Sequence, residues 1–224
     1  MEARHGKDAE VEDFLRSALP LARQEVTTVA WFAIRFGRSE YGIFDVFLDD
    51  AGRDAHLAGP IAQALMAQAD ALFAKPPQIH KLTVLADKLP VGAAPSATKA
   101  LLLTFKAKGG HTSEVEQFLR DAKAHVQSEE GTTSWFAIHL DDGDYGIFDV
   151  FPDNGARFTH LIGHVPRELA KHALSLLGSM PELELINVIA EKNLMPLTYE
   201  AKVQLRQPGA WKGLFGHSKA FFER

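Results

Sequence analysis

The residues of this sequence that are best suited to chemistry come as matched pairs, and the members of each pair lie 104 positions apart. His56 and Asp45 have His160 and Asp149 as their counterparts. A neutral imidazole takes up a proton near pH 7, and a neighbouring carboxylate raises its basicity. We therefore expect these side chains to take a proton from a substrate hydroxyl. The alternative is structural: each histidine bonds to a helix end, and each aspartate accepts a hydrogen bond from an aromatic side chain.

Aromatic and basic residues follow the same spacing. Tyr41 and Tyr145 each begin a predicted strand, where a catalytic phenol would lie at the mouth of a pocket. The alternative for the tyrosines is a half-buried ring with a solvated hydroxyl. Trp31 and Trp135 offer flat surfaces on which an aromatic ring can stack, and their alternative is packing in the core. Arginine and histidine side chains complete the expected substrate-binding set. Its members are Trp31, Trp135, Arg35, His139, Arg53 and Arg157.

The numbers and spacing of cysteine and histidine decide which metal sites the sequence could form. There is no cysteine, which excludes thiolate catalysis, disulfides and cysteine-ligated metal. His160 and His164 have the i, i+4 spacing of a zinc-binding pair, but the glutamate of the H-E-x-x-H pattern is missing. In addition, Pro60 takes the place of His164 in the first repeat. We expect no metal and no cofactor.

Composition excludes several classes of protein. The 224 residues are 46 % hydrophobic and 24 % charged, which is typical of a globular chain. Lysine and arginine number 24 against 29 aspartates and glutamates, so no basic excess is available for nucleic acid. No apolar run approaches the ~20 residues of a membrane helix. We expect a cytoplasmic protein without a nucleic-acid or membrane partner.

The paired residues belong to a long internal repeat. Residues 31–34 (WFAI) recur as 135–138, and the run YGIFDVF occurs twice with the same offset. A period of 104 residues indicates two domain-sized copies, because solenoid repeats span only about 20–50 residues. We predict three regions, which are residues 1–90, 98–194 and 195–224.

The two copies differ at their edges. Residues 100–106 (ALLLTFK) read as a strand before the first helix of the second copy, whereas the matching part of the first copy would lie before residue 1. Residues 197–205 (LTYEAKVQL) alternate apolar and polar side chains, as a strand does. We predict that this C-terminal strand completes the first unit. The alternative is a tail that packs outside it.

The second copy shows the expected order of elements. Ser113 and Glu116 form the capping-box pattern that starts a helix, and the prolines near residue 166 predict a break in the second helix. The order β-α-β-β-α-β is typical of a ferredoxin-like unit, so we predict an α+β chain with two such units in tandem. The expected strands are 100–107, 132–140, 145–151 and 183–190, and the expected helices follow Ser113 and cover 157–178.

Loop geometry predicts which strand residues face one another. A three-residue loop that ends in glycine, here 141–143, favours a type I turn followed by a bulge. That loop pairs Trp135 with Asp149 and His139 with Tyr145, so these four side chains share one face of the sheet. The opposite face is wholly apolar, and the first copy has the same pattern.

A known family shows the same combination of runs. The sequences W-F-A-I, Y-G-I-F-D-x-F and H-L-x-G resemble the antibiotic biosynthesis monooxygenase-like family of dimeric α+β barrels, which includes quinol monooxygenases. The resemblance covers residues 1–90 and 98–194. It implies two units joined through their sheets, which the duplication would place in one chain as an intramolecular pseudo-dimer. Pairing of two chains into a further homodimer is left open.

The same resemblance implies oxidation of phenolic or quinol-type aromatic molecules by O2, without flavin or metal. We therefore expect a cofactor-independent monooxygenase whose substrates are an aromatic small molecule and O2. The alternative is a non-catalytic small-molecule-binding or stress-related protein, because a fold does not fix a function. A cavity lined by the candidate residues favours the enzyme. A solid core around Asp149 and His160 favours the alternative.

Overall fold

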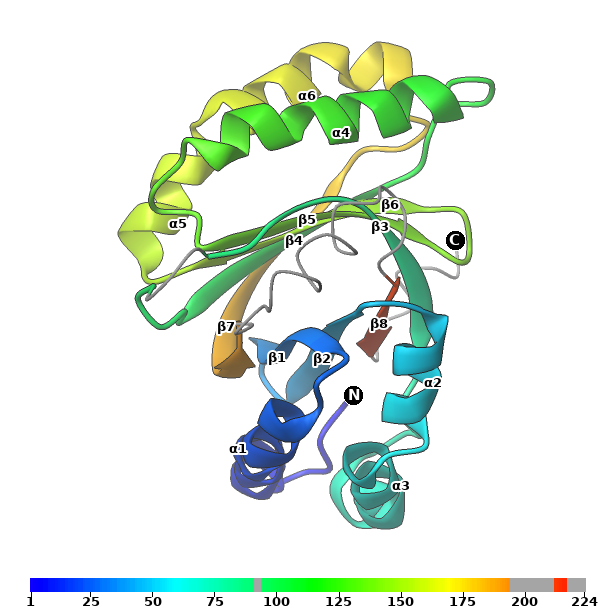
Figure 1. Ribbon diagram of the computed structural model, residues 1–224, viewed down its shortest axis with the longest axis vertical. Coiled ribbons are helices and arrows are strands. Elements are labelled where there is room, and N and C mark those ends of the chain that lie inside the picture. The colour runs from blue at the N-terminus through cyan, green and yellow to red at the C-terminus, as the bar shows by residue number, and fades with distance from the viewer. Residues whose placement is uncertain (91–93, 194–211, 217–224) are drawn as a thin grey trace. The chain divides into compact units, whose positions relative to one another are not determined.

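The computed structural model describes residues 1–90, 94–193 and 212–216. Helices and antiparallel strands make an α+β fold, as predicted (Figure 1). The predicted edge strand 197–205 lies outside the described residues. None of the helices within these ranges combines the length and the apolar character that crossing a membrane requires.

The chain divides into two compact units. Unit 1 comprises Met1–Thr83 together with Asn187–Arg224, and unit 2 comprises Val84–Ile186. The unit boundaries fall inside strand β3, His80–Lys88, and strand β7, Glu182–Lys192. The last residues of each sequence repeat therefore belong to the unit that is built mainly from the other repeat.

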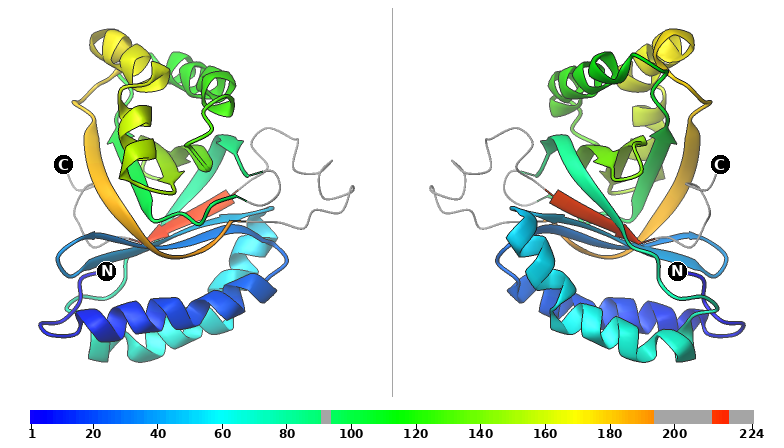
Figure 2. Two further views of the ribbon diagram at one scale, coloured as in Figure 1. Left: turned by 90° about the vertical axis from the view of Figure 1, so that its left-hand side faces the viewer. Right: turned by 90° about the vertical axis from the view of Figure 1, so that its right-hand side faces the viewer.

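Unit 2 has a sheet with helices along one face (Figure 2). Strand β6 pairs antiparallel with β5 on one side and with β4 on the other. Strand β3 lies beside β5, and β7 lies beside β4. The elements of this unit are β4 (Lys99–Phe105), α4 (Thr112–Gln127), β5 (Ser134–Leu140), β6 (Tyr145–Phe151), α5 (Asn154–Leu161) and α6 (His164–Leu176).

Unit 1 repeats this arrangement, again with its helices along one face of the sheet (Figure 2). Strand β1 pairs antiparallel with β2 and with the part of β7 between Asn187 and Lys192. The remaining elements follow the order found in unit 2. They are α1 (Asp8–Gln24), β1 (Thr28–Gly37), β2 (Glu40–Phe47), α2 (Asp50–Leu57) and α3 (Pro60–Leu72).

A strand from the C-terminal tail takes part in unit 1. Strand β8, Lys212–Gly216, lies between β2 and β3 and is antiparallel to both. Strand β4 has the same place in unit 2, between β6 and β7. The registers also agree, because Leu214 lies opposite Asp45 just as Leu101 lies opposite Asp149. Strand β8 is thus the counterpart of β4.

The predicted register of the hairpin is confirmed. Trp135 lies opposite Asp149, and His139 lies opposite Tyr145. Gly143 ends the loop with a φ of +91°, in the left-handed region that glycine adopts without strain. The first repeat has the same cross-strand pairs at the equivalent positions of β1 and β2.

Of the two predictions about helix ends, one is confirmed and one is wrong. The break in the second helix of unit 2 is confirmed, because α5 ends at Leu161 and α6 begins at His164. The capping box is wrong, since α4 begins at Thr112 after His111 and no side chain caps it. Ser113 therefore lies inside the first turn, where its hydroxyl is not in the position to cap the helix.

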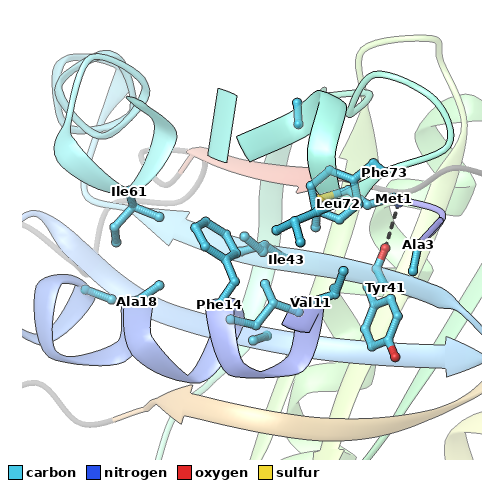
Figure 3. Close-up of a cluster of buried hydrophobic side chains, with 14 of the residues drawn as sticks. Met1, Ala3, Val11, Phe14, Ala18, Tyr41, Ile43, Ile61, Leu72 and Phe73 are labelled. Carbon is cyan, nitrogen blue, oxygen red and sulfur yellow. Dashed lines mark hydrogen bonds between the residues drawn. The ribbon is translucent and has the colours of Figure 1, made fainter. Parts of the chain in front are cut away.

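The sheet face that carries the candidate residues packs against helices in both units. In unit 1, Phe14 and Ile61 from the helices meet Tyr41 in an apolar cluster (Figure 3). The same cluster contains Trp31, and its counterpart in unit 2 contains Trp135. Both tryptophan side chains are fully buried. They belong to the cores of their units.

Candidate functional site

The two candidate histidines lie at the ends of equivalent short helices. Asp49 caps α2 and Asp153 caps α5, each by accepting a hydrogen bond from a first-turn amide, at 2.7 and 2.9 Å. Such caps satisfy amides that have no partner within the helix and so fix where it begins. His56 and His160 then fall in the last turns, and both are buried.

In unit 1 the imidazole of His56 lies between two carboxylates. Its Nδ1 is 2.7 Å from Glu25 Oε2, and its Nε2 is 3.5 Å from Asp45 Oδ2. Thr28 donates its hydroxyl to the same glutamate oxygen at 2.5 Å. Lys192 donates to the Glu25 main-chain carbonyl at 2.5 Å. The structure thus joins the predicted histidine and aspartate through contacts that also involve a glutamate.

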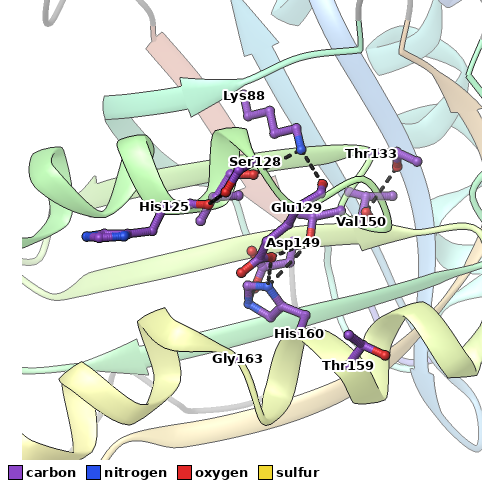
Figure 4. Close-up of polar contacts among 12 residues, drawn as sticks. Lys88, His125, Ser128, Glu129, Thr133, Asp149, Val150, Thr159, His160 and Gly163 are labelled. Atoms are coloured by element: carbon purple, nitrogen blue, oxygen red, sulfur yellow. Dashed lines mark hydrogen bonds and ion pairs between the residues drawn. The ribbon is translucent and has the colours of Figure 1, made fainter.

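Unit 2 contains the same constellation (Figure 4). His160 Nδ1 is 2.6 Å from Glu129 Oε2, and its Nε2 is 3.4 Å from Asp149 Oδ2. Thr132 donates to Glu129 at 2.8 Å, and Lys88 donates to the Glu129 carbonyl at 2.5 Å. We call these five residues and their counterparts in unit 1 the histidine constellations.

Sequence reasoning missed three members of each constellation. They lie on segments that match no familiar catalytic pattern, so their residue types alone did not single them out. The offset of 104 residues would have found them, because every member recurs with it. The missed pairs are Glu25 with Glu129, Thr28 with Thr132, and Lys88 with Lys192.

The carboxylates on either side raise the pKa of both histidines. Burial alone would lower the pKa of His160, but the carboxylates of Asp149 and Glu129 outweigh it and raise that pKa to about 10. The pKa of His56 is likewise raised by its two carboxylates against the effect of burial. Burial would raise the pKa of Glu129, but the hydrogen bonds from His160 and Thr132 lower it. The flanking carboxylates therefore stabilise the cationic form of each imidazole, whereas the sequence analysis considered the neutral form.

The pKa values of the two aspartates are shifted as well. Burial raises the pKa of Asp45 to about 7 although the His56 cation opposes this, and the pKa of Asp149 is raised for the same reason. Among the described residues, no hydrogen bond reaches the Oδ1 atom of either aspartate. The indole nitrogens of Trp31 and Trp135 likewise donate no hydrogen bond to any described residue. A raised pKa together with an unused acceptor atom suits proton transfer.

The candidate tyrosines lie away from the histidines. Tyr145 and Asp149 share one face of β6 but are separated by about 13 Å, at ~3.3 Å per strand residue. The Tyr145 hydroxyl is 3.4 Å from Glu116, and the ring of His139 stacks on the tyrosine with centroids 4.5 Å apart. Burial and the Glu116 carboxylate raise the pKa of Tyr145. This phenol is therefore a poor proton donor at neutral pH.

Unit 1 has an arginine in place of this stacked histidine. Arg35 donates to Glu12 at 2.9 Å, and its guanidinium carbon lies 5.9 Å from the centroid of the Tyr41 ring. Tyr41 in turn donates its hydroxyl to Asp8 at 3.0 Å. The predicted residues Tyr41, Arg35 and their counterparts in unit 2 thus form a second polar cluster at the other end of each hairpin.

The other two predicted arginines, Arg53 and Arg157, make contacts within their own units. Arg157 donates to the carbonyls of Ala100 and Ile186, at 3.3 and 3.1 Å, and so ties α5 to strands β4 and β7. Arg53 donates to Asp50 at 2.5 Å and is buried. Arg157 therefore holds the sheet together through main-chain atoms, which is a structural contact.

An open pocket of about 570 Å³ reaches the constellation of unit 2. Glu129, Thr132 and His160 line it, whereas Asp149 lies behind the histidine. Within the described ranges, histidine, aspartate and glutamate side chains do not gather in a group of three that could hold a metal ion. The other polar residues of the pocket are His125, Ser128, Glu130, Thr159 and His164.

Comparison with known proteins shows where this fold occurs. No family model and no curated protein matches the chain. A structure from Fusobacterium nucleatum named "putative monooxygenase" superposes with a TM-score of 0.71 at 13 % identity, over 88 % of this chain and 93 % of that one. A second protein with that name, from Lactobacillus acidophilus, gives 0.66 at 13 % identity over 86 % and 92 %. The chain therefore shares the fold of these two structures.

Two further structures extend the comparison. An anthrone oxidase-like protein has a TM-score of 0.53 at 8 % identity, over 88 % of this chain and 93 % of the other. A protein of unknown function from Nitrosomonas europaea is 32 % identical over 47 % of this chain and all of its own, with a TM-score of 0.43. At 8–13 % identity the likeness shows the fold and leaves the reaction to be argued from the site.

Proposed function

We propose that this monooxygenase-like protein uses O2 to oxidise a phenolic or quinol-type aromatic molecule without a bound cofactor, and that the reaction takes place in the pocket of unit 2. The observation that supports this most is the contact between an open pocket of about 570 Å³ and a buried proton-transfer constellation. Small-molecule sites usually have volumes of about 300–1,000 Å³. The pocket therefore has room for an aromatic substrate beside Glu129 and His160.

The constellation suits the acid–base part of this reaction. A substrate hydroxyl bound at Glu129 gives its proton to that carboxylate, which still accepts a hydrogen bond from His160 Nδ1. The imidazolium releases its Nε2 proton to Asp149, so that the negative charge gained by the substrate is balanced within the site. Asp149 can hold the proton because burial raises its pKa. The substrate is then a phenolate, which is the electron-rich form that reacts with O2.

The oxidation itself draws its electrons from the substrate. One electron passes from the phenolate to O2, and the superoxide that forms combines with the ring radical to make a carbon–oxygen bond. The constellation returns one proton to this peroxide, and loss of water with the ring hydrogen leaves a quinone. Phenol and O2 thus become quinone and water, and no outside reductant is needed.

We also propose that the two repeats, residues 1–90 and 98–194, together form the intramolecular two-unit barrel that the family resemblance implies. The matching strand order and register of the two units support this arrangement. The C-terminal region, residues 195–224, would complete unit 1, which β8 supports by lying between β2 and β3.

A second candidate function is non-catalytic binding of the same kind of molecule. Burial favours it: His160 is only 5 % exposed, and both of its ring nitrogens face carboxylates. Trp135, which was expected to stack on the substrate, is fully buried in the core. In this case the constellation would stabilise unit 2, and the pocket would hold a ligand without reacting with it.

Oxygen consumption tests the proposal. The probes are a panel of hydroquinones, catechols and polycyclic phenols, and the variants are His160→Gln and the matched His56→Gln. We expect His160→Gln to lower kcat/KM at least about 100-fold, because acid–base catalysis contributes about 10²–10⁴-fold. The His56 variant should keep most of the activity, because that residue belongs to unit 1.

Three other results of the oxygen-consumption test would contradict the proposal. Equal losses in the two variants would contradict the assignment to unit 2. Unchanged turnover in His160→Gln would remove the histidine from the mechanism. Saturable binding of a phenol to the wild-type protein without oxygen consumption would favour the non-catalytic function.

A further inference from the structure

Each histidine constellation contains a lysine that comes from the other sequence repeat. Lys88 ends the last strand of the first repeat but lies in unit 2, whereas Lys192 ends the last strand of the second repeat and lies in unit 1. Lys88 donates to the carbonyls of Val126 and Glu129, at 3.0 and 2.5 Å. Lys192 makes the two equivalent contacts in unit 1, at 2.9 and 2.5 Å.

The lysine contacts fix the peptide that carries the glutamate. Helix α4 ends at Gln127, so the carbonyls that Lys88 binds lie at a helix C-terminus. These carbonyls also accept hydrogen bonds from turn amides, from Glu129 N at 3.0 Å for Val126 and from Thr132 N at 3.3 Å for Glu129. A cation there adds a charge-assisted hydrogen bond to each and interacts favourably with the helix dipole. The side chain of Glu129 extends from this same peptide to His160, and Lys88 and His160 both approach that segment in Figure 4.

Packing alone does not explain why a lysine occupies these positions. Lys192 is only 9 % exposed, and burial lowers the pKa of both Lys192 and Lys88. Burying an ammonium is unfavourable unless hydrogen bonds compensate it, whereas an apolar side chain of similar length has no such cost. The hydrogen bonds to the two carbonyls are therefore the feature that requires a lysine.

We infer that Lys88 and Lys192 are positioning residues, and that each histidine constellation is complete only with the last strand of the other repeat. A single repeat contains all five residue types, but its own lysine lies in the constellation of the other repeat. One repeat alone therefore cannot assemble the five-residue constellation. The lysine acts through Glu129 or Glu25 and does not touch the histidine ring.

NMR titration of the histidine rings in the full chain tests this inference without any substrate. The variants are Lys88→Met and Lys192→Met, and each serves as the control for the other. If Lys88 positions Glu129, Lys88→Met lets the glutamate move away, and the pKa of His160 falls by about one unit, a tenfold loss of proton affinity. The pKa of His56 stays unchanged in that variant and falls only in Lys192→Met.

If Lys88 acts only through its charge, the pKa of His160 should change in the opposite direction. Removing a nearby cation makes a histidine easier to protonate, so a rise in the pKa of His160 in Lys88→Met would overturn the inference. No change would overturn it as well. If Lys88→Met does not fold, Lys88→Arg replaces it, because arginine keeps the charge but not the compact donor geometry. A lower pKa of His160 in Lys88→Arg supports positioning, and an unaltered pKa contradicts it.

A turnover measurement extends the test, and this part rests on the proposed monooxygenase function. Lys88→Met should move the basic limb of the kcat/KM profile to lower pH together with the pKa of His160. If the wild-type protein oxidises none of the phenols, the proposed function fails while the titration still decides the role of the lysines. If the wild type is active and Lys88→Met leaves the profile in place, the inference about positioning fails instead.

Discussion

The two units contain the same buried constellation but surround it with different side chains. In both, a histidine lies between an aspartate and a glutamate, with a threonine and a lysine bound to the glutamate. The polar pocket residues of unit 2 have mostly apolar counterparts in unit 1. His125, Ser128, Glu130, Thr159 and His164 correspond to Leu21, Gln24, Val26, Ala55 and Pro60.

This comparison of the two units distinguishes residues that stabilise the fold from residues that could contact a ligand. Removing one partner of a buried charged network leaves an uncompensated charge, so both units require the whole network to remain stable. Surface residues at the pocket are under no such constraint and can differ. The repeated acid–base residues are therefore not by themselves a sign of activity, and the pocket lining distinguishes unit 2.

The largest loss of stability is expected from changes to the half-buried glutamates of the constellations. Glu129→Gln and Glu25→Gln should each lower the free energy of unfolding by about 3 kcal/mol, because each leaves a buried imidazolium with one carboxylate. Glu130→Gln is the control, and as an exposed position it should stay within about 0.5 kcal/mol. Denaturant unfolding measures all three. A large loss in one unit only would show that the two constellations are not equivalent.

A smaller loss of stability is expected at a position where β8 and β4 have different residues. Gly213 in β8 corresponds to Ala100 in β4, and a Cβ at Gly213 would lie 2.7 Å from the Asp45 carbonyl and would also collide with Leu82 Cδ1. Gly213→Ala should therefore destabilise the protein by about 1–3 kcal/mol through overpacking. The reverse change, Ala100→Gly, should cost only about 0.5–1 kcal/mol.

Thermal unfolding of these two variants measures the difference between the edge strands. If Gly213→Ala were as stable as the wild type, β8 would not approach the Asp45 backbone so closely, and the expected difference between β8 and β4 would be wrong.

The smallest expected effect is the change in the free energy of unfolding per pH unit. The pKa of His160 is about 10 in the folded protein against 6.5 as its ordinary value, so the folded state binds more protons between those values. The contribution of His160 to stability is complete below pH 6.5 and is lost as the pH rises towards 10. The slope for one such group is at most about 1.4 kcal/mol per pH unit.

Urea unfolding between pH 6 and pH 10 measures this slope. His160→Gln should remove one part of it and His56→Gln a separate part, and the two parts should add because the residues lie in different units. A slope that His160→Gln leaves unchanged would contradict the cationic state of His160.

Local rules predicted much of the fold. The 104-residue offset and the alternation of side chains along two short strands are local patterns, and they led to the α+β order and to the pairing of Trp135 with Asp149. The capping box at Ser113 failed because the helix begins at Thr112, two residues earlier than a cap at Ser113 would place it, and helix ends depend on the surrounding loop as well as on residue type.

The sequence by itself determined the duplication, the hairpin register and the recurring histidine–aspartate pair, because these follow from spacing along the chain. Only the tertiary structure decided the rest. It brought Glu129 and Lys88 to His160 from segments 31 and 72 residues away in sequence, and it separated Tyr145 from that group. It also decided the charge of the imidazole, since a pKa depends on burial and on neighbouring carboxylates that spacing alone does not reveal.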